Sequence, residues 1–452
     1  MKLFLFDDAG ADRWRPFALT RPIGEVRFGA FALRERIERW AGIEAAGSLT
    51  RPWLARYREA GAPPARPRND VPAGDLLLVS SRFVPEGGRL ATALESAGAG
   101  SGAGSGGSGS KSGGGPLVLV CDGAVVGCRL TAGDERPDAA WLADPVELPG
   151  GRAVEVPGRR LGGVWQLVEH GPDRLARDVD EIASGGGGSS GGGSSGGADS
   201  GAHSGSAGHG KAARSHRATT APPGVHVLGD GPLVFGADVF IEPGALLDTR
   251  AGGIVLGDRT TVRTGARLEG PIAVGPDCKL LGGAYSILSA GPRCGLRGEL
   301  EETTAFGYVN KAHDGFIGHA VIGRWVNLGA LTTNSDLKNT YGKIALGGPD
   351  GPVETGLIKI GCLLGDHVRT AIGTLLNTGT VVGAGASVFG ARMPPKWVPP
   401  FAWGAEGEAV SYDLGRFLDT AATVLGRRGV EADEQVRGWW SDCWQRAAGG
   451  EG

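Results

Sequence analysis

The chain has 452 residues, of which 41% are hydrophobic, and it carries a formal net charge of -3 with a pI near 6.3. This length accommodates two or three domains with cores of their own. The nearly balanced charge gives no electrostatic reason to expect nucleic acid or an anionic membrane surface as a partner, so we expect neither.

The cysteines and the N-terminus indicate the compartment. The six cysteines form no CxxC pair and no short disulfide framework, which suits a reducing environment, and we interpret them as packing residues. The apolar run after Met1 is too short for a signal peptide and ends at Asp7 and Asp8. No segment has the length and composition of a membrane span, so we expect a cytoplasmic protein.

Residues 1–183 are expected to form an α/β domain. Apolar runs predict strands at Lys2–Phe6, Leu76–Ser80 and Leu117–Cys121, and helical periodicity is found around Ala30–Trp40 and again over Val164–Ile182. Alternation of strands and helices along the chain is typical of this fold class.

Two Gly/Ser-rich tracts account for part of the 83 glycines. The tract at 97–115 is interpreted as a flexible loop inserted in the N-terminal domain, since long surface loops cost little closure entropy. The second tract, at 185–210, belongs to a flexible linker predicted over 184–224.

Beyond the linker, apolar residues recur every six positions, and many are followed by glycine. A strict period of six fits neither a helix nor an alternating strand, but it is typical of a hexapeptide β-helix. We therefore predict a β-helix over 225–402. The repeat comprises Leu228, Val234, Phe240 and Leu246; Leu256, Val262, Leu268, Val274 and Leu280; Phe316, Ile322 and Leu328; and Ile358, Leu364, Thr370, Leu376, Val382 and Val388.

The period breaks at 247–255, 281–315 and 329–357. Solenoids accommodate insertions as loops, and such loops often build binding sites. His313 lies at the end of the second break and Asn334 lies inside the third. After the repeat, residues 403–452 form a tail in which helical pattern runs from 412 to 447. Its apolar stripes are expected to pack on the open end of the coil or on a neighbouring subunit, with substrate binding as the alternative.

The segments Lys311-Ala312-His313, Phe316-Ile317-Gly318, Val326 to Ala330 and Asn334-Ser335-Asp336 resemble a known enzyme family. They are similar to the acetyltransferase half of the bifunctional glucosamine-1-phosphate acetyltransferase / N-acetylglucosamine-1-phosphate uridylyltransferase family. With Phe6-Asp7-Asp8, Thr20-Arg21-Pro22 and Asn310 to Gly315, the chain more closely resembles a bacterial branch of sugar nucleotidyltransferases. The resemblance implies a left-handed parallel β-helix, a homotrimer, and small-molecule substrates.

The resemblance also implies an acetyl-CoA site and a catalytic base. His313 matches the histidine that deprotonates the acceptor amine, a task suited to imidazole near neutral pH. The matching acceptor-binding positions are Lys311, Asn327, Asn334 and Arg297. The acetyl-CoA groove matches Gly329, Ala330, Thr370, Ala371, Ile372 and Gly373. Taken without these motifs, a lone histidine beside an acid is often only a hydrogen-bonded structural residue. Cys362 has no recognisable partner and is interpreted as packing.

Three positions depart from the better-known relatives. Phe316 and Ser335 stand where those relatives have tyrosines, and Glu302 falls near a phosphate-binding lysine. An acid at that position would repel an anionic acceptor. A phosphate on the acceptor would therefore need positive charge from Arg293, Arg297 or Lys311.

The N-terminal domain offers Asp7-Asp8-Ala9-Gly10 in place of the family's glycine-rich loop. Asp8 is the candidate Mg²⁺ ligand. Four arginines are candidates for binding the triphosphate of UTP, although such a cluster is as often a solvated or structural face. These are Arg13, Arg15, Arg21 and Arg27.

Two functional hypotheses follow. The first is a sugar-nucleotide biosynthesis enzyme that transfers acetyl from acetyl-CoA to a glucosamine-1-phosphate-like acceptor and then joins the sugar phosphate to UTP. The second is a nucleotide-sugar-binding scaffold or sensor, favoured by the missing glycine-rich loop. A third interpretation keeps the acyltransferase but gives it another nucleotide-linked sugar as acceptor.

Overall fold

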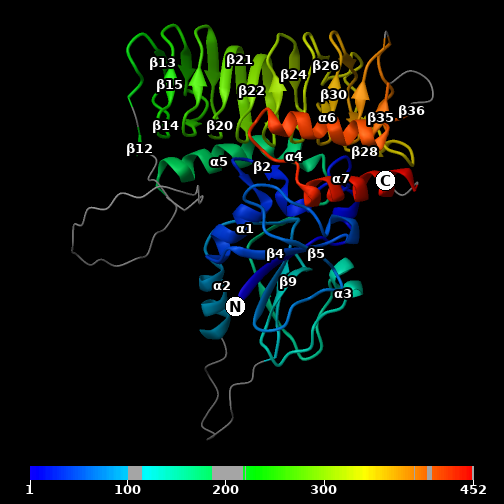
Figure 1. Cartoon of the computed structure of the whole chain (residues 1–452). Coiled ribbons are helices and arrows are strands. Elements are labelled where there is room, and N and C mark those ends of the chain that lie inside the picture. The colour runs from blue at the N-terminus through cyan, green and yellow to red at the C-terminus, as the bar shows by residue number, and fades with distance from the viewer. Residues whose placement is uncertain (100–114, 186–216, 219, 391, 405–409, 450–452) are drawn as a thin grey trace, which may run out of the picture.

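The computed structural model describes residues 1–99, 115–185, 217–218, 220–390, 392–404 and 410–449. An α/β domain lies below a long prism of β-strands, and the C-terminal helices run along the junction between them (Figure 1). The Gly/Ser tracts predicted to be flexible fall almost entirely outside the described residues. No helix in the part of the chain that the structure describes is long and apolar enough to span a membrane.

The N-terminal domain is built on a mostly parallel sheet with the strand order β10-β8-β9-β6-β1-β4-β5. β1 pairs in parallel with both β4 and β6, while β9 runs antiparallel to β6 and β8. The strands predicted from the sequence coincide with β1, β6 and β8. The sheet consists of β1 (Lys2–Phe6), β4 (Ala45–Thr50), β5 (Ala65–Pro67), β6 (Leu76–Ser80), β8 (Leu117–Cys121), β9 (Ala124–Leu130) and β10 (Arg152–Glu155).

Helices and short strands complete this domain. The predicted helices correspond to α1 and to the pair α4 and α5. The remaining elements are the helices α2 and α3, the 3-10 turns, and two small antiparallel pairs, β2 with β3 and β7 with β11. Their bounds are α1 (Leu33–Ala41), α2 (Leu90–Ala99), α3 (Ala139–Ala143), α4 (Gln166–Glu169), α5 (Gly171–Ala183), η1 (Ala11–Arg13), η2 (Ile23–Glu25), η3 (Pro52–Leu54), β2 (Arg27–Phe28), β3 (Phe31–Ala32), β7 (Phe83–Pro85) and β11 (Gly158–Arg160).

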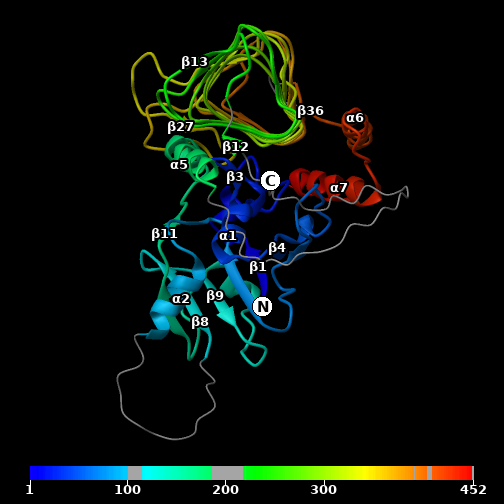
Figure 2. The same ribbon diagram turned by 90° about the vertical axis from the view of Figure 1, so that its left-hand side faces the viewer.

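The C-terminal half is a three-sided parallel β-helix, as the period of six predicts. Each strand pairs with the third strand further along the chain, so that β13 stacks on β16 and β14 on β17. Viewed along its axis, the solenoid has a triangular cross-section (Figure 2). Its three flat sides are called here the first, second and third faces.

The first face consists of β14 (Leu233–Phe235), β17 (Ile254–Leu256), β20 (Ile272–Val274), β25 (Val321–Ile322), β29 (Cys362–Leu364), β32 (Thr380–Val382) and β34 (Trp397–Val398). The second consists of β15 (Phe240–Ile241), β18 (Thr261–Val262), β23 (Asn310–Lys311), β30 (Arg369–Thr370), β33 (Ser387–Val388) and β35 (Ala402–Trp403). The third consists of β13 (His226–Leu228), β16 (Leu246–Asp248), β19 (Ala266–Glu269), β24 (Phe316–Gly318), β26 (Thr333–Asn334) and β31 (Leu375–Leu376).

Several elements lie outside this scheme. Two long strands, β21 (Lys279–Ala290) and β22 (Gly295–Ala305), bend around the corners and pass over all three faces. At one end of the solenoid β12 (Arg217–Ala218) pairs antiparallel with β14, and at the other end β36 (Val410–Ser411) pairs antiparallel with β35. β27 (Ala345–Leu346) pairs antiparallel with β28 (Val353–Glu354).

The predicted interior positions are confirmed from Leu256 to Leu280, but the first coil is out of phase by one residue. Its core side chains are Ile241 and Leu247, whereas Phe240 is exposed. The error has a physical cause: the first-face strands are apolar on both sides, because Val234 packs outward against α5. Phe316 and Ile358 likewise lie outside the core. In the coil of Phe316, the neighbouring residue Ile317 is the one that is buried.

Two of the predicted breaks have different structures. The segment 281–315 is not a loop, because Leu280 stacks on Leu296 and Leu296 on Lys311, so the coils continue with fewer residues per turn. In contrast, Ile322 stacks on Leu364 across a true insertion. This insertion carries β27 and β28, and its Ile344 packs against the N-terminal domain.

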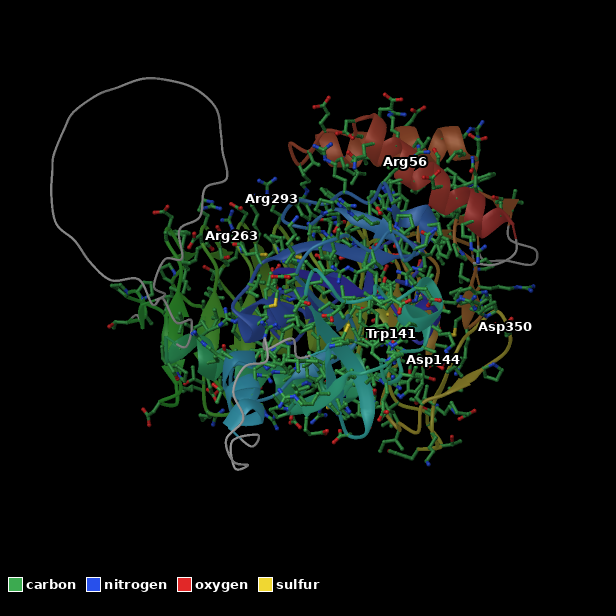
Figure 3. All side chains as sticks on the ribbon, turned by 90° about the horizontal axis from the view of Figure 1, so that it is seen from below. Arg56, Trp141, Asp144, Arg263, Arg293 and Asp350 are labelled. Carbon is green, nitrogen blue, oxygen red and sulfur yellow. The ribbon has the colours of Figure 1, made fainter. Side chains whose placement is uncertain are left out.

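The two domains share a large apolar interface along the first face. Phe17 of the N-terminal domain lies 4.8 Å from Phe306, and α5 covers Val234 and Val255 of the earliest coils. Seen from below, the N-terminal domain lies in front of the solenoid, with Arg263 among the early coils and Asp350 towards the far end (Figure 3).

The C-terminal tail is helical, as predicted, and it divides into α6 (Leu414–Gly426) and α7 (Glu434–Ala448). They cover the corner between the first and second faces, where Trp440 packs on Phe401, Phe417 and His367. On its other side α7 contacts the N-terminal domain, since Trp439 lies 5.0 Å from Tyr57. The tail therefore packs within its own chain, on both domains.

Candidate functional site

His313 lies at the corner between the second and third faces. It follows β23, whose Lys311 points into the core, and its imidazole is exposed with no partner among the described residues. Its neighbour Asp314 accepts a hydrogen bond of 2.9 Å from Arg297 of the preceding coil. The histidine is therefore free to meet a ligand approaching this corner.

The residues predicted to line the acetyl-CoA groove come together at the same corner. Leu331 N donates to Asp314 O at 2.9 Å, and Gly373 N donates to Ala330 O at 2.8 Å, which places three successive coils one above another. Gly329 N also meets Thr370 Oγ1 at 3.0 Å. A Cβ on Gly329 would lie 2.5 Å from the carbonyl of Ala371, so only glycine allows this close stacking.

The four predicted acceptor-binding residues divide into two pairs. Lys311 is fully buried, and its ammonium donates to the carbonyl oxygens of Arg297 and His313. Asn334 is also buried and hydrogen-bonds the backbone of Gly318 in both directions. Neither side chain faces solvent. Asn327, which is exposed, and Arg297, which is partly exposed beside His313, remain accessible to an acceptor.

Glu302 belongs to an ion-pair cluster at the corner between the third and first faces. It lies 3.1 Å from His319 Nε2, while Asp336 lies 2.7 Å from His319 Nδ1. Burial lowers the pKa of His319, but the hydrogen bond to Glu302 and the charges of Glu302 and Asp336 outweigh it, so the pKa is raised. A protonated imidazole would hydrogen-bond Glu302 and interact with Asp336 through its charge. With Glu301 the group could also hold a cation, since the ligand atoms lie within 4.8 Å of one another.

Asp8 does not fit the role of a magnesium ligand. It is buried, and Arg82 donates to both of its oxygens at 2.7 Å, while Ala11 N donates to Oδ1 at 2.9 Å. The Cβ of any other residue at Gly10 would clash with this guanidinium, 2.2 Å away. The carboxylate is thus fully engaged and offers no free oxygen to a Mg²⁺ ion.

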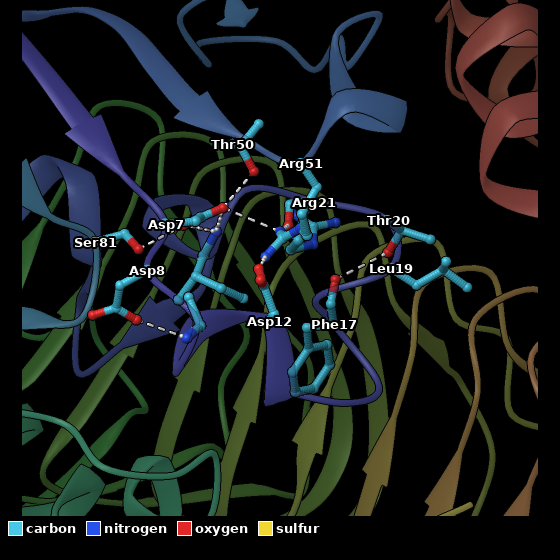
Figure 4. A network of polar contacts seen from close by, with 12 residues as sticks. Asp7, Asp8, Asp12, Phe17, Leu19, Thr20, Arg21, Thr50, Arg51 and Ser81 are labelled. Atoms are coloured by element: carbon cyan, nitrogen blue, oxygen red, sulfur yellow. Dashed lines mark hydrogen bonds and ion pairs between the residues drawn. The ribbon is translucent and has the colours of Figure 1, made fainter. Parts of the chain in front are cut away.

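Asp7 and Asp12 are engaged in the same way at the carboxyl ends of β1, β4 and β6 (Figure 4). Asp7 accepts hydrogen bonds from Thr50 and Ser81 and lies 3.1 Å from Arg51. Asp12 is held by Arg51 and by a second arginine, Arg68. Ligands often bind at this edge of an open α/β sheet. Here all three carboxylates already face arginines or hydroxyl groups.

The four arginines predicted to bind nucleotide do not converge. Arg13 is exposed, and Arg15 approaches Asp350 at 3.4 Å on the surface. Arg27 donates to Ser289 at 2.7 Å across the domain interface. Arg21 is fully buried, where Asp366 and Glu59 hold its guanidinium at 2.8 and 3.2 Å. In this structure Arg21 joins the two domains and is not accessible to a triphosphate.

The cysteines are confirmed as packing residues, since all six are free and buried. Burial raises the pKa of the Cys362 thiol to about 12, which leaves it protonated and unreactive.

Sequence reasoning missed three further arginines. Arg369 of β30, with Arg427 and Arg428 after α6, lines a pocket of about 450 Å³ that also includes Asn327. Their positions differ widely along the chain, so no local motif marks them. The signal that could have pointed to them is the pair Arg427-Arg428 directly after an amphipathic helix.

Comparison with known proteins finds matches that each cover part of the chain. Residues 3–186 match a family described as "Sugar nucleotidyl transferase". The chain is 24% and 25% identical over 149 residues to two Escherichia coli proteins, of strains K12 and 536, whose names describe uncharacterized acetyltransferases called YaiX. These matches span 32% of this chain and 65% of each relative.

A third relative is the "Bifunctional sugar-1-phosphate nucleotidylyltransferase/acetyltransferase" of Sulfurisphaera tokodaii. It is 28% identical over 105 residues, which is 23% of this chain and 26% of that protein. The chain therefore spans less than two thirds of the length of each of these relatives. The family match over 3–186, the β-helix and the transferase names of the relatives together fit a transferase of sugar-nucleotide chemistry.

Proposed function

We propose that the protein is a bifunctional enzyme of sugar-nucleotide synthesis. Its β-helix would transfer acetyl from acetyl-CoA to the amine of a glucosamine-1-phosphate-like sugar, and its N-terminal domain would transfer uridylyl from UTP to the sugar 1-phosphate. The observation that carries the proposal is the free His313 imidazole, which stands beside a column of closely stacked backbone at Gly329 and Gly373. The sugar nucleotidyl transferase match supports the second activity.

The chemistry at His313 follows from its exposure. The acceptor amine attacks the thioester carbonyl carbon, His313 takes a proton from the nitrogen, and the carbon–sulfur bond breaks to release coenzyme A. A positioned base of this kind contributes about 10²–10⁴-fold to the rate. Backbone N–H groups along the stacked corner are suited to the oxyanion and to the amides of the pantetheine arm.

We further propose that a homotrimer completes this site. The corner beside His313 exposes three apolar side chains on neighbouring coils: Leu331 is 58% exposed, Ile372 78% and Leu375 49%. Apolar side chains gathered at one edge often mark a surface that another chain covers. A second β-helix packed there would close a groove for acetyl-CoA between the two copies.

The test of acetyl transfer is the release of coenzyme A from acetyl-CoA in the presence of glucosamine 1-phosphate. We expect His313→Ala to lower kcat at least about 100-fold with a small change in KM. Asp314→Asn, at the adjacent exposed position, is the control and should keep most activity. An unchanged rate in His313→Ala would remove His313 from the mechanism. A screen of other nucleotide-linked amino sugars by mass spectrometry tests the alternative acceptor.

The N-terminal domain has a second candidate function, that of a sensor or scaffold which binds a nucleotide sugar without turnover. One observation favours it: Asp8 is neutralised by Arg82 and Arg21 by Asp366. Pyrophosphate release from UTP and N-acetylglucosamine 1-phosphate separates the two candidates. Turnover supports the transferase, whereas binding of UDP-N-acetylglucosamine in a calorimeter without pyrophosphate release supports the sensor.

A further inference from the structure

A pocket lies between the second face of the solenoid and the C-terminal end of α6. Its volume is about 450 Å³, within the range of small-molecule sites. β23 and β30 form one wall, and the residues that follow α6 form the other. The tail thus encloses a space on the second face of the β-helix, and His313 lies at the far corner of the same face.

The pocket is strongly basic. Arg369, Arg427 and Arg428 line it, no carboxylate does, and none of these three has an ion-pair partner among the described residues. Neighbouring arginines behave differently: Arg297 pairs with Asp314 and Arg324 with Glu59. Three uncompensated cations around one small space repel one another, and that repulsion is relieved when an anion binds.

The helix end does not cancel this charge. A helix C-terminus carries about half a negative charge on its free carbonyl groups. Two of the last carbonyls accept hydrogen bonds, from Arg427 N to Thr423 O at 3.1 Å and from Arg428 N to Leu425 O at 2.9 Å. Half a negative charge is in any case small beside three guanidinium charges. The carbonyl of Arg428 itself accepts a hydrogen bond of 2.6 Å from Arg293. The guanidinium groups therefore dominate the field in the pocket.

The rest of the lining suits a sugar. Asn310 Nδ2 donates to Asn327 Oδ1 at 2.8 Å, which fixes the orientation of the Asn327 amide. The NH₂ group of Asn327 then has no partner among the described residues. Tyr308 and Trp325 stack with ring centroids 3.9 Å apart and add an apolar edge. Fixed amides beside aromatic carbon recognise hydroxyl groups and ring carbons together.

We propose that this pocket binds the phosphate of a phosphorylated sugar through Arg369, Arg427 and Arg428, with Asn327 holding the sugar ring. Asn327 precedes Gly329 and Ala330 on the same coil, so a sugar held by Asn327 would extend along the second face towards the corner of His313. The assignment of this sugar as the acetyl acceptor rests on the proposed function, while phosphate binding itself does not.

The proposal also accounts for the charge that the acceptor needs. Lys311 is buried, Arg297 is paired with Asp314, and Arg293 is shared between Asp277 and a carbonyl. The positive charge comes instead from β30 and from the end of α6. This makes the C-terminal tail part of the binding site in addition to its packing role.

The test measures binding of glucosamine 1-phosphate to the full chain by calorimetry, without acetyl-CoA, so that it is independent of turnover. We expect unphosphorylated glucosamine to bind at least about 100-fold more weakly, because charge-assisted hydrogen bonds to the phosphate are lost. Arg369→Gln and the double variant Arg427→Ala/Arg428→Ala should each lower the affinity for glucosamine 1-phosphate about 10- to 100-fold. Arg416→Ala, an exposed arginine on α6 that does not line the pocket, should bind as wild type.

Several outcomes would overturn the proposal. Equal affinity for the two sugars would do so, as would wild-type affinity in the arginine variants with unchanged circular dichroism. Adenosine 3′,5′-bisphosphate, the phosphorylated end of coenzyme A, is the rival ligand. If it binds tightly and the sugar phosphate does not, the pocket belongs to the cosubstrate. If sugar phosphate binds as expected but no acetyl is transferred, the pocket stands and only the proposed reaction fails.

Discussion

Lys311 occupies an interior position of the solenoid where the preceding coil carries Leu296. Burial lowers the pKa of its ammonium to about 8. Because the folded pKa lies below the ordinary value near 10.4, the unfolded chain binds more protons between these values, and stability rises with pH across that window. The charged form costs about 3 kcal/mol below pH 8.

We expect the free energy of unfolding of wild type, minus that of Lys311→Met, to increase by about 2–3 kcal/mol between pH 7.5 and pH 10.5. Urea denaturation at a series of pH values measures both. The other lysines titrate alike in the two proteins, so the difference isolates Lys311. Parallel stability curves for the two proteins over this range would contradict a depressed pKa.

His319 gives the opposite pH dependence. Its raised folded pKa means that the imidazolium contributes stability in full below about pH 6.5, and this contribution is lost as pH rises through the folded pKa. The hydrogen bond from His319 lowers the pKa of Glu302. The stability that the Glu302 carboxylate contributes is therefore lost only as pH falls through this lowered pKa. The cluster therefore stabilises the fold most at pH values between the pKa of Glu302 and that of His319, in mildly acidic solution.

We expect His319→Gln to destabilise the protein by about 3 kcal/mol at pH 6, with a clearly smaller loss at pH 9. Glu301→Gln is the control, since its ion pair with Lys359 is longer, at 3.7 Å, and partly exposed; its loss should stay within about 1 kcal/mol. Thermal unfolding at both pH values tests this. A His319→Gln effect that is the same at both pH values would contradict a titration of the imidazole between them.

The sequence suggested which individual residues could bind ligands, but it could not show which of them are already paired within the fold. Asp8 and Arg21 were plausible ligands from composition, yet each meets a partner far away in the chain: Arg82 is 74 positions from Asp8, and Asp366 is 345 from Arg21. Such pairings depend on tertiary contacts that no local pattern encodes. His313 was singled out as the candidate base because its neighbours form a motif and the repeat is irregular there, and its role stays a prediction.

Elements were far more predictable. Strands β1, β6 and β8 have the predicted bounds, since an apolar run between polar turns fixes a buried strand. The period of six predicted the solenoid, but it could not fix the phase of the first coil, where Val234 and Val255 are apolar because α5 covers them. A period indicates which positions repeat, whereas the side they face depends on what packs outside.

The tail shows how an element is held by a single aromatic residue. Trp440 of α7 is buried and lies 4.8 Å from His367, 5.3 Å from Phe417 and 4.7 Å from Trp439. We expect Trp440→Ala to cost about 3–5 kcal/mol, because a large cavity opens between α6, α7 and the solenoid. Burial of His367 lowers its pKa to about 3, so this ring stays neutral in the apolar cluster.

The measurement is chemical denaturation together with amide hydrogen exchange, which should accelerate first in α6 and α7. Trp403→Ala serves as the control because Trp403 is about half exposed, and it should cost about 1 kcal/mol or less. If both variants lost the same stability, the burial of Trp440 would not be what anchors the tail.

At the scale of the whole molecule, the two domains are joined by a buried polar hub set in apolar surface. Asp366 of the solenoid accepts hydrogen bonds from Thr20 Oγ1 at 2.6 Å and Arg21 Nε at 3.0 Å, and from the backbone of Arg324 at 2.7 Å. Phe306 packs on Phe17 beside it. Because so much of each domain's surface is buried against the other, we expect the full chain to unfold in one cooperative transition.

We expect Asp366→Ala to remove 3–5 kcal/mol of stability, roughly the cost of leaving a buried guanidinium with one partner fewer. Arg21 would retain only Glu59, which it already shares with Arg324, so the interface should weaken more than either core. Calorimetry should then resolve two transitions where wild type has one. Asp350→Ala breaks the interdomain ion pair with Arg15, but that pair is solvent-exposed and its loss should change stability by less than about 1 kcal/mol. A single transition in Asp366→Ala, shifted but not split, would mean that the apolar contacts alone couple the domains.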